Sequence, residues 1–165
     1  KPQKYHAKSL AALREKLGDS VEVVHERGCW TEKTTPALEA PSLAAPGGVG
    51  ALDVEFYAGL EWEGDPVEKR STRSAELLFF GSPGEGLNPG AFSFRATGRL
   101  VPSESGRHVF SLIQAGRARL LVDGEVIIDG FADPPPPGEA FFSLGSQEAE
   151  GVFDLIAGHA VDIVI

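Results

Sequence analysis

Three aspartates, Asp123, Asp129 and Asp133, lie close together in the sequence, and carboxylates at such spacing could hold a calcium ion. They lack the alternating oxygen ligands and the final glutamate of an EF-hand loop. Asp123 precedes Gly124, a pair typical of a tight β-turn, and Asp129 is expected to end a strand. The sequence therefore assigns these aspartates to turns and predicts neither a metal site nor a cofactor.

Other side chains that could perform chemistry are scattered along the chain. The glycine-rich run at residues 47–50 lacks the Lys-Ser/Thr pair that a phosphate-binding loop requires, and no Gly-x-Ser-x-Gly elbow occurs. The 24 acidic residues are too many for any one pair to indicate a glycosidase. We therefore predict no catalytic residue in this chain. The four histidines show no ligand spacing: His6, His25, His108 and His159.

The most unusual segment runs from Gly130 to Leu144, where four consecutive prolines are bracketed by Phe131, Phe141 and Phe142. Prolines stiffen a surface loop, and aromatic faces on a stiff loop can stack on sugar rings. Alternatively, Phe141 or Phe142 begins the next strand, and of that pair we expect one ring inside the core and one outside. These three phenylalanines are the predicted substrate-binding residues.

Charge and hydropathy narrow the choice of partner. The net charge of −9 repels phosphate backbones and anionic lipid, so we expect neither nucleic acid nor a membrane surface as partner. Neutral sugars and other domains of the same protein remain open. No apolar run approaches the roughly 20 residues that span a bilayer, and no signal peptide is present in the segment. We expect a soluble protein of undetermined compartment.

The first part of the chain has the pattern of a different domain. Leucines recur at helical spacing between Ala7 and Leu17, and Gly18 supplies a stop. The β-branched run at residues 21–26 predicts a strand. A helix and a strand are half of an α/β unit, which cannot bury its faces alone. Residues 34–50 have the composition of a linker. We therefore divide the chain into an α/β fragment with its linker, residues 1–45, and a second domain, residues 46–165.

Helix signals nearly vanish in the second domain. Residues 92–100 alternate apolar and polar side chains, residues 52–58 and 75–80 predict further strands, and Asp123-Gly124 predicts a hairpin with both residues at positive φ. Two more runs flank Ala157-Gly158. About eight short strands with frequent turns predict an antiparallel β-sandwich. The ten phenylalanines all lie in this part and could supply its core without any binding role.

The run from Phe92 to Gly130 resembles the protective-antigen-type β-sandwich domain. That family shows the pattern G-x-L-x-P-x-x-x-G-x-H/Y-x-F-x-L followed by G-x-A-x-L-x-V-D-G. The resemblance covers roughly residues 52–165 and implies that the last strand of the domain is missing. The matching positions are Gly98, Leu100, Pro102, Gly106, His108, Phe110, Leu112, Gly116, Ala118, Leu120, Val122, Asp123 and Gly124.

The leader carries a second resemblance, to the α/β sandwich domain of family 3 β-glucosidases, in which a protective-antigen-type module is inserted shortly afterwards. The two halves in this order are more specific than either alone. The matching positions are Leu10, Leu13, Arg14, Leu17, Gly18, Val21, Val23, Gly28 and Cys29.

These resemblances imply a non-catalytic accessory module of a β-glucosidase-type glycoside hydrolase. In that family the nucleophile and the acid/base lie in regions that this chain does not contain, so the chain should be inactive by itself. The module is understood to shape which β-glucosides or short oligosaccharides enter the active site. The alternatives are a free-standing carbohydrate-binding or adhesion domain and a spacer that only stabilises its host. Some adhesins with this fold grip calcium with two adjacent aspartates, a pair that this sequence lacks.

Overall fold

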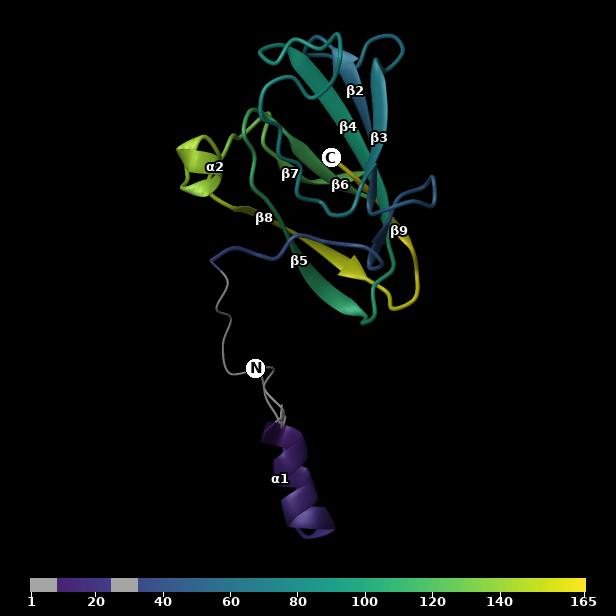
Figure 1. The fold of residues 1–165 in the computed structure, drawn as a ribbon, viewed down its shortest axis with the longest axis vertical. Helices are drawn as coiled ribbons and strands as arrows, with labels where there is room; N and C mark the ends of the chain where they lie inside the picture. Colours follow the sequence, from purple (N-terminus) through teal and green to yellow (C-terminus); the bar gives the residue numbers. More distant parts are fainter. Residues whose placement is uncertain (1–8, 25–32) are drawn as a thin grey trace, which may run out of the picture. The chain divides into compact units, whose positions relative to one another are not determined.

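The computed structural model describes residues 9–24 and 33–165 (Figure 1). The chain divides between Lys33 and Thr34 into two compact units, and each is described by itself. Within the described ranges, no helix has both the length and the apolar character needed to cross a bilayer.

The first unit contains helix α1, Ser9–Leu17, in the region where the leucine spacing predicts one. Gly18 follows with φ of +57°, the left-handed conformation that ends many helices. A short 3₁₀ turn, η1, then covers Gly18–Ser20. Leu13 and Leu17 are 50% and 39% exposed, so the apolar stripe of α1 is not buried.

The strand predicted at residues 21–26 does not form in the part that is described. Val21 is extended, with φ −137° and ψ 127°, but residues 21–24 pair with no described strand. Because a strand is held by hydrogen bonds to a neighbouring strand, β-branched residues alone do not make one. His25 and Glu26, like Ala7 of the predicted helix, lie outside the described residues.

The second unit consists of antiparallel sheets, which confirms the predicted mainly β fold. The larger sheet has seven strands in the order β3-β2-β4-β9-β6-β7, with β1 paired to β4, and the smaller sheet pairs β5 with β8. The strands are β1 (Leu43–Ala44), β2 (Leu52–Ala58), β3 (Glu68–Thr72), β4 (Phe92–Leu100), β5 (Gly106–Leu112), β6 (Arg119–Val122), β7 (Glu125–Asp129), β8 (Ala149–Leu155) and β9 (Val161–Val164), and the short helix α2 (Ala140–Ser143) precedes β8.

Strand β4 has the bounds that its alternating pattern predicts and runs through the larger sheet (Figure 1). Its apolar side chains face the core, and Arg95 and Arg99 are exposed. It pairs with three strands: Phe94 lies opposite Phe56 of β2, Thr97 opposite Val164 of β9, and Leu100 opposite Leu43 of β1.

The hairpin of β6 and β7 is also confirmed. Asp123 and Gly124 have φ of +47° and +81°, so both turn residues adopt the left-handed region that a type I′ turn requires. Strands β8 and β9, which flank Ala157-Gly158, do not pair with each other. Strand β8 pairs with β5, whereas β9 pairs with β4 and β6, so the chain crosses from the smaller to the larger sheet at this turn.

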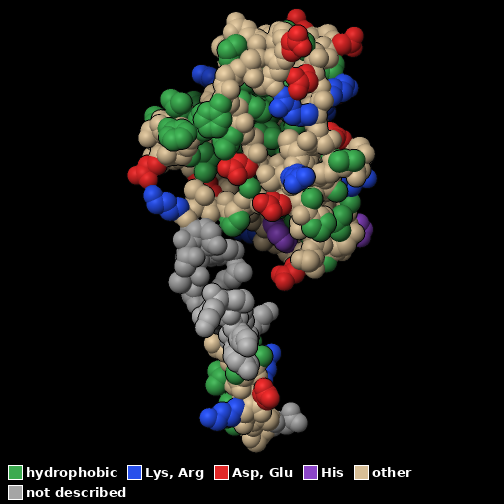
Figure 2. All heavy atoms as spheres, viewed as in Figure 1, with side chains coloured by type: hydrophobic (Ala, Val, Ile, Leu, Met, Phe, Trp, Pro, Cys, Tyr) green, Lys and Arg blue, Asp and Glu red, His purple; other side chains and the backbone are tan. Residues whose placement is uncertain are grey.

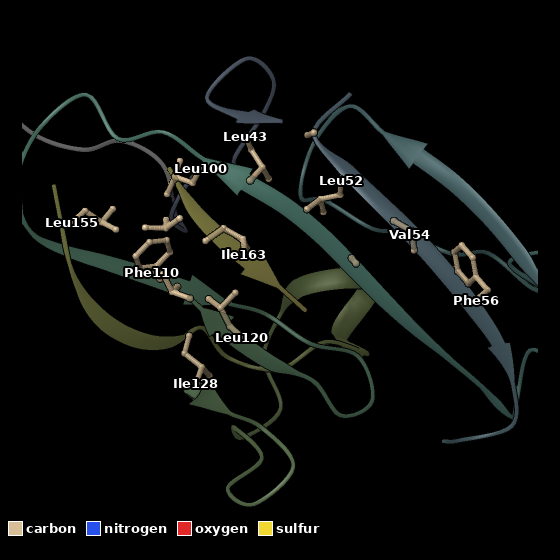
Figure 3. Packing of buried hydrophobic residues seen from close by; sticks show 14 of the residues in the cluster. Leu43, Leu52, Val54, Phe56, Leu100, Phe110, Leu120, Ile128, Leu155 and Ile163 are labelled. Carbon is tan, nitrogen blue, oxygen red and sulfur yellow. The ribbon is translucent and has the colours of Figure 1, made fainter. Parts of the chain in front are cut away.

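A single apolar cluster fills the space between the two sheets (Figure 3). Phe56 and Leu43 are 0% exposed and contribute from the larger sheet, while Phe110 and Leu155 contribute from the smaller one. This arrangement is the sandwich that the sequence predicts. The labelled members in Figure 3 are Leu43, Leu52, Val54, Phe56, Leu100, Phe110, Leu120, Ile128, Leu155 and Ile163.

Residues 75–80 do not form the predicted strand. The backbone N–H of Ala75 donates to Leu38 O at 2.7 Å, and the rest of the segment pairs with no described strand. Phe79 packs edge-on against Phe56 with ring centroids 5.4 Å apart, whereas Phe80 is 74% exposed. The apolar run therefore reflects tertiary packing of Phe79 rather than sheet formation.

Residues 34–50 have the composition of a linker but make close contacts with the β-sheets. Leu43 is fully buried, and the backbone N–H of Thr35 donates to the Glu148 carboxylate at 2.9 Å. The N–H of Gly47 donates to the Asp53 carboxylate at 2.6 Å. In the structure these residues belong to the second compact unit.

Candidate functional site

Three phenylalanine rings from two separate segments meet at the surface of the second unit. Phe80 lies 5.4 Å from Phe141 and 6.4 Å from Phe142, and the last two rings are 6.1 Å apart, all between centroids. Phe80 and Phe142 are 74% and 82% exposed. We call Phe80, Phe141 and Phe142 the aromatic cluster. Figure 2 shows hydrophobic side chains gathered on the side of the molecule where Figure 1 places α2.

The backbone beneath the aromatic cluster is left-handed. Phe141, Phe142 and Ser143 have φ of +50°, +55° and +65°, so α2 is a left-handed turn rather than a regular helix. Each non-glycine residue in this conformation costs about 1–2 kcal/mol. Strain of this kind persists only where the surrounding structure imposes it, and it gathers at functional sites.

Backbone hydrogen bonds hold the left-handed turn closed. The N–H of Leu144 donates to Phe141 O at 3.0 Å, and the N–H of Gly145 donates to Ala140 O at 3.0 Å. The N–H of Gly138 donates to Gly145 O at 2.8 Å, which joins the end of the proline run to the residue after the turn. The turn is therefore a closed surface loop that presents both rings.

Gln114 ties the two ends of this loop together from inside the protein. It is 7% exposed, and its Nε2 donates to Gly130 O, where the loop begins, at 3.1 Å. At the other end, the N–H of Ser146 donates to Gln114 O at 2.8 Å, and Gln114 N–H donates to the Ser146 hydroxyl at 3.1 Å. Gly130 packs so closely that a Cβ there would overlap Gln114 Oε1.

Phe131 occupies a separate place at the start of the loop. Its ring lies 4.8 Å from the guanidinium carbon of Arg119 and is 43% exposed. Arg117 donates to Phe131 O at 2.7 Å. Oδ1 of Asp129 accepts from Arg119 Nε at 2.9 Å and from the N–H groups of Phe131 and Ala132 at 3.0 and 3.1 Å. Asp129 therefore organises the beginning of the loop.

Asp129 gives the stability of this region a predictable dependence on pH. Its hydrogen bonds, first from Arg119 and then from the Ala132 amide, hold the pKa of the carboxyl below its ordinary value. The charged form therefore stabilises the fold above the ordinary aspartate pKa, and this contribution is lost as the pH falls through the lower folded-state pKa. We expect Asp129→Asn to be less stable than the wild type at neutral pH, with the difference shrinking below about pH 4.

Urea denaturation midpoints of the two proteins across this pH range test the expectation. Asp133→Asn is the matched control, because within the described residues its carboxylate has no hydrogen-bond partner. A difference between wild type and Asp129→Asn that stays constant with pH would contradict the assignment.

The structure brings two of the three predicted phenylalanines together and adds one that sequence reasoning missed. Phe141 is half-buried and Phe142 is exposed, and neither belongs to the core, where one of the two rings was expected. Phe131 packs against Arg119 instead of the aromatic cluster. Sequence reasoning missed Phe80 because it lies in the apolar run at residues 75–80, which predicted a strand. The exposed rings also show that the core does not account for all ten phenylalanines.

Two of the three aspartates of the sequence analysis, Asp123 and Asp129, accept hydrogen bonds from backbone N–H groups through their carboxylates. Asp123 Oδ1 accepts from the N–H of Asp162 at 2.7 Å, and Asp133 N–H donates to Asp129 O at 3.1 Å. Among residues 9–24 and 33–165, no group of three His, Cys, Asp or Glu side chains is placed to hold a metal ion. His6 and His25 lie outside these ranges.

Comparison with known proteins gives relatives for the whole chain. It is 30% identical over 161 residues to a β-glucosidase of Rhizobium radiobacter, covering 98% of this chain and 18% of that protein. It is 29% identical over 163 residues to β-glucosidase B of Emericella nidulans, covering 97% of this chain and 18% of that protein. The chain thus spans less than a fifth of the length of these two relatives.

The fold is shared with a solved structure. A crystal structure of β-glucosidase from Kluyveromyces marxianus superposes with a TM-score of 0.72 at 23% sequence identity, covering 92% of this chain and 19% of that one. The structure of the same enzyme in complex with glucose gives a TM-score of 0.69. A sequence model described as the PA14 domain matches residues 50–165, which include strands β2 to β9 and the loop that carries Phe141 and Phe142. The chain belongs to the PA14 domain family.

Proposed function

We propose that this chain is a non-catalytic accessory module of a family 3 β-glucosidase-type enzyme. The observation that carries the proposal is that curated β-glucosidases align with 98% and 97% of the chain, including residues that precede the PA14 match. A shared leader favours a piece of a larger enzyme over a free-standing domain. The exposed apolar stripe of α1 also suits a fragment of an adjoining α/β domain. We assign residues 1–45 to that fragment and its linker, of which the residues from Thr34 onward are grouped with the second compact unit.

The aromatic cluster is the part of the module that we assign to substrate selection. Soluble proteins rarely expose adjacent large apolar side chains without a binding role. Here Phe141 and Phe142 are held on a strained, closed turn, and Phe80 packs against both rings from a separate segment. The turn orients its two rings before any ligand arrives. Phenylalanine faces offer stacking area to a sugar ring or an apolar aglycone. In this role the aromatic cluster lies at the active-site entrance and sets the preference among β-glucosides and short oligosaccharides.

Single alanine substitutions in the intact parent enzyme test this role. We expect Phe80→Ala, Phe141→Ala and Phe142→Ala each to change the ratio of kcat/KM for cellobiose to that for cellotetraose by about tenfold, since each removes part of the stacking surface. Phe131→Ala should change the ratio less, because its ring packs against Arg119.

Val109→Ala is the matched control, since Val109 is a similarly exposed apolar residue on β5 of the smaller sheet. If the ratio stays the same in every phenylalanine variant, the aromatic cluster does not select substrate.

A further inference from the structure

The outer face of the larger sheet carries a fixed, exposed tryptophan. Trp62 lies in the connection between β2 and β3, and its indole Nε1 donates to Phe94 O of β4 at 3.1 Å. The hydroxyl of Ser93 donates to Glu61 O at 3.2 Å, which holds the same connection to β4 at a second point. Even so, Trp62 is 54% exposed. A large aromatic side chain that is held in place yet exposed is pre-organised for contact with a ligand.

Polar and charged groups surround this indole. The guanidinium carbon of Arg95 lies 5.8 Å from the centre of the Trp62 ring. Arg95 stands opposite Glu55 in the β2–β4 register, and Glu55 stands opposite Lys69 in β3. The Glu55 carboxylate accepts from Lys69 Nζ at 2.6 Å and from the hydroxyl of Tyr57 at 3.1 Å. These side chains form a row across three strands that ends at Trp62.

The hydrogen-bonding capacity of Arg95 is unused. In the described parts of the chain its guanidinium makes no hydrogen bond or ion pair, and the side chain is exposed. Glu55 is oriented by two donors and is only partly exposed, so its position is also fixed. A ligand at Trp62 would therefore meet several free N–H donors beside a fixed aromatic face.

This surface is separate from the aromatic cluster. Side chains along a strand alternate between the two faces of a sheet. Glu55 and Arg95 thus point away from the core side, where Phe56 and Phe94 both contact Phe79. The two surfaces can be altered independently, and nothing about the Trp62 surface depends on the proposed role of the aromatic cluster.

We propose that Trp62 and Arg95 form a second binding site, for a pyranose unit of a neutral oligosaccharide. The C–H face of the sugar stacks on the indole, and the guanidinium donates to its hydroxyl oxygens. Glu55 lies within the same row as an acceptor for a sugar hydroxyl. The Glu55 carboxylate offsets one of the two nearby cations, Lys69 and Arg95, and the net charge of −9 on the chain disfavours an anionic ligand.

Tryptophan fluorescence tests the site directly, because the chain contains only two tryptophans. In a Trp30→Phe background, Trp62 is the sole emitter. Titration of the 165-residue chain with cellotetraose and with laminaritetraose is expected to give a saturable change in emission, with a Kd on the order of millimolar for one of them. No saturable change with either sugar into the tens of millimolar would overturn the proposal.

Single variants of the wild-type chain show where the oligosaccharide binds, with the affinity measured by calorimetry. We expect Trp62→Ala and Arg95→Gln each to weaken it about tenfold, and Arg95→Gln leaves the bond from Trp62 to Phe94 in place. Leu60→Ala, at an exposed apolar residue of the same connection, should leave affinity unchanged. If Phe142→Ala abolishes binding while Trp62→Ala does not, the sugar binds at the aromatic cluster and the proposal is wrong. A Trp62 emission in the intact parent that is blue-shifted and insensitive to sugar would mean that a protein surface covers the site, which also overturns it.

Discussion

Replacing Gln114 with leucine is expected to lower the free energy of unfolding by about 2–4 kcal/mol, because it leaves buried polar groups without partners. The side chain donates to Gly116 O at 3.2 Å and to Gly130 O at 3.1 Å, and its Oε1 accepts from Ala118 N–H at 3.2 Å. Leucine has a similar volume but can make none of these bonds. Since Gly130 begins the loop that presents Phe141 and Phe142, we expect this loop to be the first part of the protein to lose stability.

Urea denaturation of the 165-residue chain measures the change in stability, and amide hydrogen exchange at Ala118 locates it. Gln147→Leu is the matched control: Gln147 is exposed, and its amide makes one long bond, of 3.4 Å, to Pro137 O. Equal stability of the two variants would show that Gln114 does not hold the loop.

Replacing Phe56 with alanine is expected to cost about 3–5 kcal/mol, the usual range for deleting a buried aromatic ring. Phe56 is 0% exposed, and its ring centroid lies 5.4 to 6.5 Å from those of Phe79, Phe92 and Phe94. The guanidinium carbon of Arg70 lies 4.6 Å from the same ring. The substitution therefore removes one of the ring contacts that join the segment around Phe79 to the larger sheet.

Thermal and urea denaturation measure this loss, with Phe142→Ala as the control for removing a phenylalanine that is 82% exposed. The control should change the free energy of unfolding by less than about 0.5 kcal/mol. Similar losses in the two variants would contradict the distinction between a core ring and a surface ring on which the functional assignment depends.

Much of the second unit could be predicted from local pattern. Strand β4 has its predicted bounds because its nine residues alternate without interruption. Phenylalanine, alanine, glycine and leucine fall on one face, and serine, arginine and threonine fall on the other. The turn at Asp123-Gly124 was predictable because few residue pairs tolerate positive φ at both positions. The pairing of β8 with β5 rather than with β9 could not be read in the same way, since alternation indicates a strand but not its neighbour.

The candidate site was only half predictable. Proline and phenylalanine composition indicated the loop, but Phe80 lies some sixty residues away from Phe141, and only the fold brings the two rings together. The left-handed turn carries phenylalanine and serine at positive φ, where glycine or asparagine would have signalled it. Its geometry is imposed by long-range bonds such as those of Gln114, which no local pattern encodes.

The position of β4 in the larger sheet has a consequence for how the module folds. Its partners are β1, β2 and β9, and β9 begins at Val161, more than 100 residues after the end of β1 at Ala44. Contacts between residues so far apart in sequence make folding slow, because long loops must close before the pairing contributes. During synthesis the larger sheet cannot close until β9 has left the ribosome, so nascent chains that stop before it expose the edges of β4 and β6 to chaperones and to one another.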